Sequence, residues 1–345
     1  KNPHDQDEQS SSSRRWHSSV SHISPAGRLR RVTDGDAAEL WVMILEKAFA
    51  KMYGSYKALN GGLVHMGLVD MTGGQSEMVE FRKEENEADV RSGKVWKKML
   101  KYRKAKYLMG CGSNAGKDTQ TSKNNIVQGH AFAILDVVEV DGHRLIKLRN
   151  PWGKVEWTGD WSDKSPLWTR RLKAKLGWVD ADDGEFWICY DDFVREFRNL
   201  YVCRLFPDSW HATGIASQWD AETAGGCVNY DTCKDNPQFL LKVSVPTEAF
   251  VTLAKDMLNN EVEHIAFSIY HTKDASSKID PQYARSGDRV ATSGKLSSLR
   301  EVSCETKLAP GKYIIVPTTY KPGQLGRFVI AIHSNKALKL TEIEA

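Results

Sequence analysis

The sequence predicts an α+β fold, an antiparallel sheet with flanking helices, up to about residue 209, followed by an all-β sandwich. Two observations indicate this division. Between residues 36 and 206, apolar residues at three-to-four spacing alternate with short apolar runs, which favours helices mixed with strands. From about residue 211, short apolar runs are separated by Gly, Pro and Asn, a pattern typical of an antiparallel β-sandwich. The length of 345 residues suits two domains.

Composition sets limits on the class of protein. Hydrophobic residues make up 41% of the chain and include eleven tryptophans, enough for substantial cores. The net charge of +4 comes from 48 basic and 44 acidic residues, and this near balance argues against a polyanionic partner such as a nucleic acid. The basic run 101–106 has the spacing of a solvated helix face. No window approaches 18 apolar residues, so we expect neither a transmembrane segment nor export.

The cysteines indicate the redox environment. The six cysteines form no CxxC pair and no compact framework, and Cys189 and Cys203 fall in apolar runs. We therefore expect a reducing, cytoplasmic location. Because the chain starts with Lys rather than Met, we also expect it to be a fragment, a processed product or an incomplete sequence.

The first elements are a polar tail and a helix. Residues 1–31 are rich in serine and poor in large apolar groups, which predicts disorder. Asp36 to Leu59 is the clearest helix, opened by a capping box of Asp36 and Glu39, and Gly54 is a candidate early break. Its apolar stripe consists of Trp41, Ile44, Leu45, Ala48, Met52 and Tyr56.

The remaining elements follow from the same patterns. Amphipathic spacing predicts helices over 77–86 and 94–104, and an apolar run predicts a strand over 107–111. A further helix, 191–198, lies between strands 186–190 and 200–206. The clearest strands of the sandwich are 239–245, 249–254, 265–270, 312–317 and 328–332.

The centre of the first domain is a predicted β-hairpin. Strands 131–140 and 144–149 are joined by Asp141-Gly142, which suits a type I′ turn because both residues tolerate positive φ. A two-residue turn places Asn150 opposite Ala133, three residues or roughly 10 Å from His130. A β-bulge or a longer turn must therefore bring His130 and Asn150 together and onto one face.

Pairing of His130 with Asn150 has a chemical meaning. An Asn carbonyl that accepts a ring N–H holds a histidine in one orientation, as in Cys-His-Asn proteases. Trp152 follows directly and can shield that hydrogen bond from water. The alternative is a structural hairpin whose His and Asn merely cap strand ends.

Several long motifs resemble the calpain family of papain-like, calcium-dependent cysteine proteases. GHAFAILDVVEV with LRNPWGKVEWTGDWSDKSPLW, and then DDGEFWICYDDFVREFRNLYVCRLFPDSW, are similar to the second half of the calpain protease core. LWVMILEKAFAKMYGSYKALNGG and MTGG resemble the segment that enters that half. GGCVNYDTCKDNPQF and LAPGKYIIVPTTYKPGQLGRF resemble the C2-like domain, so the resemblance covers roughly residues 37–334.

The resemblance implies a domain division and an activity. It implies a remnant of the first protease lobe over 32–72, the second lobe over 73–209 and a C2-like domain over 210–345. It further implies a cysteine endopeptidase acting on protein substrates, with His130 and Asn150 catalytic, Trp152 shielding them, and phospholipid contact through the C2-like domain. The calpain nucleophilic cysteine and its preceding glutamine have no counterpart here, so we expect no turnover from this chain alone.

The resemblance also implies bound Ca²⁺. Glu156, Asp163, Asp183, Glu185 and the carbonyl of Ala181 match calcium positions in the second lobe, and carboxylates on loops are the oxygen ligands that calcium prefers. Glu46 matches a calcium ligand of the first lobe. The alternative for all of these residues is that they are simply solvated acids.

Other functions remain open at this point. Cys111 precedes His130 in a Gly-Cys-Gly sequence and is a candidate nucleophile, although it ends an apolar strand without a neighbouring cation. A non-catalytic, calcium-responsive module that binds protein or phospholipid is a second hypothesis. A transglutaminase-like site uses similar chemistry, but its third member is normally Asp, and Asn150 argues against it.

Overall fold

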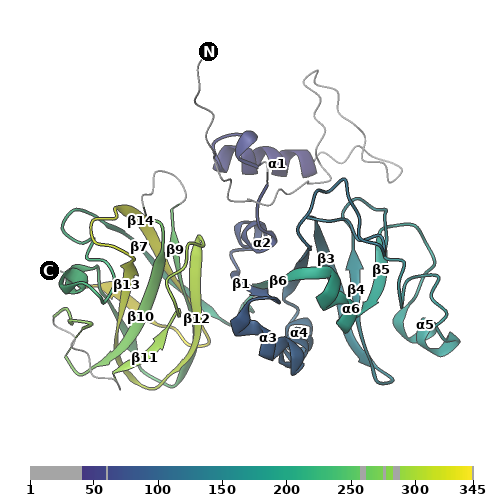
Figure 1. Ribbon diagram of the computed structural model, residues 1–345. Coiled ribbons are helices and arrows are strands. Elements are labelled where there is room, and N and C mark those ends of the chain that lie inside the picture. The colour runs from purple at the N-terminus through teal and green to yellow at the C-terminus, as the bar shows by residue number, and fades with distance from the viewer. Residues whose placement is uncertain (1–40, 60, 257–261, 275–276, 283–287, 344–345) are drawn as a thin grey trace, which may run out of the picture. The chain divides into compact units, whose positions relative to one another are not determined.

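The computed structural model describes residues 41–59, 61–256, 262–274, 277–282 and 288–343, and these divide into two compact units with the boundary between Leu205 and Phe206. Each unit is described separately below (Figure 1). The predicted disorder over 1–31 and the predicted capping box at Asp36 lie outside the described residues.

The first unit is built on one six-stranded antiparallel sheet. The strand order is β1-β6-β2-β3-β4-β5, so the first and last strands of the unit pair with each other. The strands are β1 (Gln75–Glu80), β2 (Leu108–Ser113), β3 (Ala131–Val140), β4 (His143–Arg149), β5 (Glu185–Cys189) and β6 (Phe197–Arg204). The helices are α1 (Trp41–Met52), η1 (Lys57–Leu59), α2 (Val64–Thr72), α3 (Glu84–Arg91), α4 (Lys94–Lys104), α5 (Arg170–Leu176) and α6 (Tyr190–Glu196).

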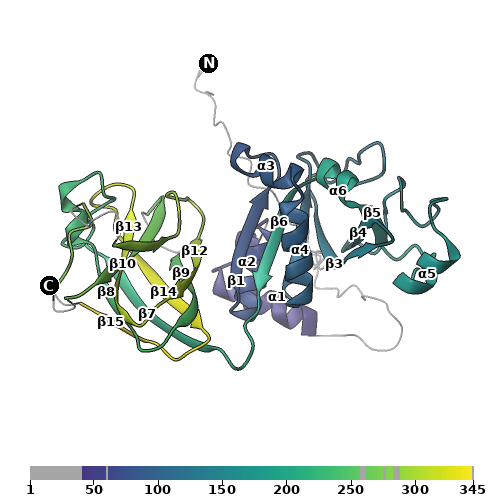
Figure 2. The same ribbon diagram turned by 90° about the horizontal axis from the view of Figure 1, so that it is seen from below.

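Helices cover both faces of this sheet. A Cβ on Gly110 of β2 would meet Val64 of α2, and the next residue, Cys111, packs in the core that includes Met99 of α4. Since successive strand residues point to opposite faces, α2 and α4 lie on opposite sides (Figure 2). The main core of the unit therefore lies between the sheet and helices α4 and α6.

Two sequence predictions for the first unit need correction. Glu77 lies in strand β1, because residues 75–80 pair with β6 in a continuous ladder, and the helix predicted over 77–86 begins only at Glu84 and runs to Arg91 as α3. The apolar stripe of α1 is largely uncovered, with Trp41 60% and Ile44 65% exposed. The break at Gly54 is confirmed, since α1 ends at Met52 and Gly54 adopts φ 85°.

The second unit is a β-sandwich, as predicted. A five-stranded sheet, β11-β10-β13-β8-β15, packs on a four-stranded sheet, β12-β9-β14-β7, and apolar side chains from both sheets form one core. The elements are β7 (His211–Trp219), η2 (Asp231–Asp235), β8 (Phe239–Val243), β9 (Thr247–Lys255), β10 (Ile265–Thr272), β11 (Arg289–Thr292), β12 (Glu301–Leu308), β13 (Gly311–Thr319), β14 (Gly326–Ser334) and β15 (Lys339–Glu342).

Candidate active site

The β3–β4 hairpin forms as the sequence predicts. Val140 pairs with His143 around a turn in which Asp141 and Gly142 have φ values of 49° and 82°, the positive values that a type I′ turn requires. The side chain of Asp141 accepts a hydrogen bond from Arg171 of α5 at 3.2 Å. The hairpin thus enters the sheet in a fixed register.

The predicted bulge lies at Leu135. The register runs without interruption from Val140 to Asp136 and then shifts by one residue, so that Ile134 pairs with Leu148 and Ala133 with Arg149. Continuing this register places Asn150 opposite Phe132. Phe132 is two residues from His130 and therefore lies on the same face of the strand. The one extra residue in β3 thus places Asn150 on the face that carries His130.

His130 and Asn150 meet in a buried pair. The distance between His130 Nε2 and Asn150 Oδ1 is 3.0 Å, and the two residues are 4% and 0% exposed. With the ring proton on Nε2, the imidazole donates to the amide oxygen. The two ends of the hairpin therefore converge as predicted, at hydrogen-bond distance.

Backbone groups fix the other atoms of Asn150. Its Nδ2 donates to the carbonyls of Lys154 at 2.7 Å and Val155 at 3.1 Å, and its Oδ1 also accepts from the amide of Trp152 at 3.1 Å. With its donors and acceptor all used, the amide has one orientation, in which the oxygen faces the imidazole.

Two aromatic rings enclose His130. The ring centroid of Trp152 lies 4.4 Å from that of His130, and the ring of Phe132 meets it edge-on at 5.1 Å. Trp152 is half-buried and packs against the main core. Trp152 therefore lies beside the His130–Asn150 pair, as the sequence predicts.

Ser113 holds the backbone of His130, a contact that the sequence reasoning missed. The Ser113 hydroxyl accepts from the His130 amide at 2.9 Å and donates to its carbonyl at 3.2 Å. The Ser113 amide also donates to the same carbonyl at 2.9 Å. The available signal was a polar residue two positions after the predicted strand 107–111, where β2 ends.

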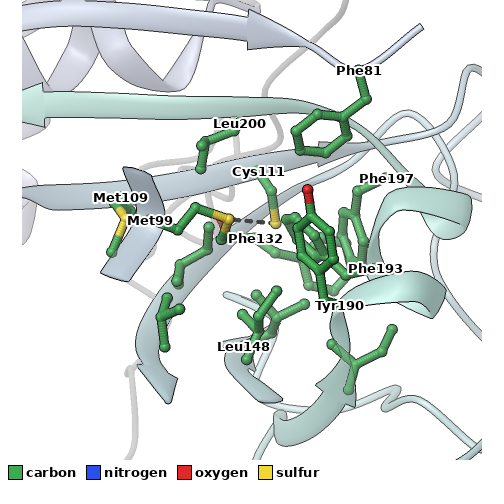
Figure 3. Close-up of a cluster of buried hydrophobic side chains, with 14 of the residues drawn as sticks. Phe81, Met99, Met109, Cys111, Phe132, Leu148, Tyr190, Phe193, Phe197 and Leu200 are labelled. Carbon is green, nitrogen blue, oxygen red and sulfur yellow. Dashed lines mark hydrogen bonds between the residues drawn. The ribbon is translucent and has the colours of Figure 1, made fainter. Parts of the chain in front are cut away.

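Cys111 is not available as a nucleophile in this structure. Its side chain is fully buried in the core with Met99, Phe132 and Leu200, and its Sγ lies 3.9 Å from the Phe132 carbonyl (Figure 3). Burial raises the pKa of the Cys111 thiol well above its ordinary value. A reactive cysteine needs the opposite, a stabilised and accessible thiolate.

The acidic residues that follow the β3–β4 hairpin gather beside the pair. Burial, together with the negative charges of Asp163 and Asp183, raises the pKa of Glu156. Burial and the charges of Asp180 and Asp183 raise the pKa of Asp163 to about 6. A bound cation would reduce the repulsion between these neighbouring carboxylates. Carboxylate oxygens are also the ligands that calcium prefers, so these side chains fit a calcium site.

The acidic side chains nevertheless have protein partners here. Glu156 Oε1 accepts from the Gly184 amide at 2.7 Å, Asp183 accepts from the Glu185 amide at 2.8 Å, and the backbone of Ala181 donates to Asp163. Glu185 pairs with Lys147 at 2.6 Å and Arg149 at 3.6 Å. Among the described residues, no three His, Cys, Asp or Glu side chains form a group that could hold a metal ion.

Gly184 links the acidic turn to the His–Asn pair. Its amide donates to Glu156 and its carbonyl accepts from the Asn150 amide at 2.8 Å. Its φ is +84°, and a Cβ there would lie 2.8 Å from the Asn150 carbonyl oxygen. Only glycine fits this position, which the sequence reasoning did not single out.

Glu46 lies apart, on α1. Its Oε2 is buried without a hydrogen-bond partner within the described part of the chain, and burial raises the pKa of its carboxyl group. No described acidic residue is grouped with it into a metal site.

Comparisons with known proteins agree on the class of this chain. Residues 22–204 match the profile described as "Calpain family cysteine protease", and residues 215–333 match "Calpain large subunit, domain III". The class is therefore that of the cysteine proteases. The chain belongs to the calpain family.

Individual relatives support the family over most of the chain. The chain is 40% identical over 326 residues to the maize protein "Calpain-type cysteine protease DEK1", covering 88% of this chain and 15% of that protein. It is 34% identical over 359 residues to mouse "Calpain-8", covering 92% and 50%. It is 31% identical over 366 residues to human "Calpain-1 catalytic subunit", covering 92% and 49%. The chain thus spans half or less of the length of these relatives.

The described residues include no helix long and apolar enough to cross a membrane. All six cysteines are free thiols.

Proposed function

We propose that this chain supplies the His/Asn half of a calcium-dependent cysteine endopeptidase of calpain type. The observation that supports it is the buried contact between His130 Nε2 and Asn150 Oδ1, beside Trp152. Asn150 engages Nε2, which assigns the other ring nitrogen, Nδ1, to the proton exchange with the thiol.

Acylation of the nucleophile divides into two proton transfers. Nδ1 of His130 takes the proton of a cysteine thiol, and the thiolate forms a bond to the peptide carbonyl carbon. As the C–N bond breaks, the imidazolium returns that proton to the leaving amine. Deacylation follows: Nδ1 takes a proton from water, the hydroxyl bonds to the thioester carbon, and the C–S bond breaks to release the carboxylic acid and return the proton to the thiolate. Asn150 keeps the ring in place through these transfers, and Trp152 keeps water from their hydrogen bond. The nucleophile comes from sequence joined to this chain or from a partner chain.

An activity assay tests the proposal. The chain is produced alone and joined to the natural coding sequence upstream, and cleavage of a fluorogenic peptide is followed. We expect turnover only from the joined protein, loss of that turnover in His130→Ala, and a decrease of on the order of 100-fold in Asn150→Ala. Cleavage by the chain alone that disappears in Cys111→Ala would contradict the proposal and make Cys111 the nucleophile.

We propose further that Glu156, Asp163, Asp183 and the Ala181 carbonyl hold calcium. Bound calcium would neutralise the crowded carboxylates and so fix the acidic turn. Glu185 can join only by leaving Lys147 and Arg149, and we expect it to contribute least.

Calorimetric titration of the chain with calcium distinguishes these roles. We expect binding by the parent, loss of binding in Asp163→Asn and in the double variant Asp183→Ala with Glu185→Ala, and a smaller loss in Glu185→Ala alone. Absence of binding by the parent would refute the calcium site and leave the peptidase proposal to its own assay.

A further inference from the structure

The backbone of His130 is bound to a residue of the neighbouring strand, Ser113 at the end of β2. The ladder between β2 and β3 ends with Gly112 opposite Ala131, which places Ser113 opposite His130. In a regular antiparallel ladder, opposite residues of this kind exchange two backbone hydrogen bonds. The Ser113 amide makes one of them, to the His130 carbonyl at 2.9 Å.

The Ser113 hydroxyl supplies the acceptor for the second bond. The His130 amide donates to Ser113 Oγ at 2.9 Å, and the same hydroxyl donates to the His130 carbonyl at 3.2 Å. The register of β2 with β6 shifts between Gly112 and Ser113, so the strand changes direction at this residue. A side-chain oxygen thus serves where a strand carbonyl would in a regular ladder. Because Ser113 is only 2% exposed, water is not at hand to replace it.

The residue after Ser113 holds the residue before His130. The Asn114 carbonyl accepts from the Gly129 amide at 2.7 Å. The Asn114 amide donates to the Glu196 carbonyl at 3.2 Å, and its Nδ2 donates to the Arg195 carbonyl at 3.0 Å. The backbone that enters His130 is therefore tied through β2 to the end of α6.

The imidazole is thus held at two ends. Asn150 Oδ1 holds the ring at Nε2, at 3.0 Å, and Ser113 holds the backbone from which the side chain starts. If the backbone bond is lost, the ring can pivot about its contact with Asn150. Such a pivot moves Nδ1 while Nε2 stays in place, and a misplacement of about 1 Å in a reacting group can lower a rate on the order of 100-fold.

We propose that Ser113 is a positioning residue of the peptidase reaction. Its hydroxyl fixes the backbone of His130 and thereby the place at which Nδ1 meets the thiol. Ser113 exchanges no proton in the reaction and acts only through His130. The inference rests on the proposed function, because it concerns the same imidazole.

Histidine NMR on the chain alone tests the positioning without any activity. The chain is labelled with ¹⁵N-histidine, and the signals of His130 are assigned by their absence in His130→Gln. In Ser113→Ala we expect the His130 amide to exchange with solvent on the order of 10-fold faster and the imidazole to lose its single tautomer. Ser113→Cys fills the same space with a weaker acceptor and should show the same changes, whereas Ser113→Thr keeps the hydroxyl and should restore the parent spectrum.

Kinetics of the protein joined to its upstream sequence test the consequence for the reaction. We expect Ser113→Ala to lower kcat on the order of 10-fold and to leave KM within about twofold, because the hydroxyl acts on the base and not on the substrate. Ser334→Ala is the matched control. Ser334 is also buried, also ends a strand, and donates from Oγ to the Lys336 carbonyl at 2.8 Å, but it lies in the second unit. It should keep the parent kcat.

A double-mutant cycle with Asn150 separates positioning from a general loss of stability. Ser113 and Asn150 act on opposite ends of one side chain, so their effects on kcat should be coupled. We expect the double variant Ser113→Ala with Asn150→Ala to lose on the order of 100-fold, as Asn150→Ala does alone, and not the roughly 1,000-fold of two independent effects.

Several outcomes would overturn the role of Ser113. These are parent-like His130 signals in Ser113→Ala, a kcat within twofold of the parent, an equal loss in Ser334→Ala, or independent effects in the double variant. Absence of turnover from the joined parent would instead refute the peptidase proposal, and the NMR comparison would still decide whether Ser113 positions His130.

Discussion

His130 and Asn150 share one face of the β3–β4 hairpin because β3 contains one residue more than β4 needs. The extra residue is Leu135, which is 45% exposed and marks the shift in register. If Leu135 paired with Leu148 instead of bulging out, Asn150 would lie opposite Ala133, on the exposed face, and its amide oxygen could not reach the imidazole. The bulge is thus the structural basis of the pair.

Deleting Leu135 should therefore leave the pair in place. Ile134 would then adjoin Asp136 directly and still pair with Leu148, so Asn150 would stay opposite Phe132 in a regular ladder. Deleting Ala133 instead would place Ala131 opposite Asn150 and turn His130 to the other face. Imidazole ¹⁵N NMR reports the tautomer, which we expect to be fixed in the parent and in the Leu135 deletion and mixed in the Ala133 deletion. A fixed tautomer in the Ala133 deletion would contradict this account of the register.

Substitution of Gly184 should be far more damaging than that of a comparable glycine. Gly184 and Gly177 both have positive φ, but a Cβ on Gly177 meets nothing within 4 Å, whereas one on Gly184 meets the backbone of Asn150 and Gly153. We expect Gly177→Ala to cost about 1 kcal/mol of stability and Gly184→Ala about 3 kcal/mol or more. Urea unfolding monitored by tryptophan fluorescence measures both, and equal costs would show that the turn relaxes around a Cβ.

The second unit should lose stability as the pH falls below about 6.5. His333 stacks on Phe206 with ring centroids 4.1 Å apart, and its buried Nδ1 has no hydrogen-bond partner among the described residues. Burial lowers the pKa of His333 from 6.5. The unfolded chain therefore takes up a proton before the folded one does, and stability is lost as the pH falls from 6.5 toward the folded-state pKa. In His333→Phe, thermal unfolding between pH 7.5 and 5.5 should depend less on pH; an unchanged dependence would assign it to other groups.

Two buried tyrosines should respond to loss of the hydroxyl with opposite signs. The Tyr190 hydroxyl is buried in the main core with no hydrogen-bond partner in the described residues, and burial raises the pKa of Tyr190 to about 12. The Tyr102 hydroxyl donates to Glu77 at 2.8 Å. We expect Tyr190→Phe to stabilise by about 1 kcal/mol and Tyr102→Phe to destabilise by about 1.5 kcal/mol in denaturant unfolding. Destabilisation by Tyr190→Phe would reveal a partner for its hydroxyl.

The sequence predicted the parts of the site that depend on local pattern. Asp141-Gly142 predicted the turn. The offset between His130 and Asn150 in a simple hairpin register predicted a bulge, and the structure contains both the turn and the bulge. The position of the bulge could not be predicted, because Leu135 is apolar like Ala133 and Ile134 before it, and only the pairing with β4 distinguishes it.

The parts that the sequence did not reveal depend on contacts distant along the chain. Ser113 reaches His130 from β2, and Gly184 reaches Asn150 from the turn before β5. Similarly, Glu77 has a helix-like context, but pairing of β1 with β6 makes it part of a strand. The spacing of apolar and polar residues predicts individual helices and strands, but it contains no information about which distant residues come into contact.

The hairpin also affects the order in which the site can form. His130 and Asn150 are 20 residues apart and joined by a tight turn, so closing that loop costs little chain entropy. Strands β1 and β6 are the first and last strands of the unit and must find each other over a much longer separation along the chain. The imidazole and the amide can therefore be in place while β1 and β6 are still unpaired. We thus expect the hairpin that holds this pair to form early in folding.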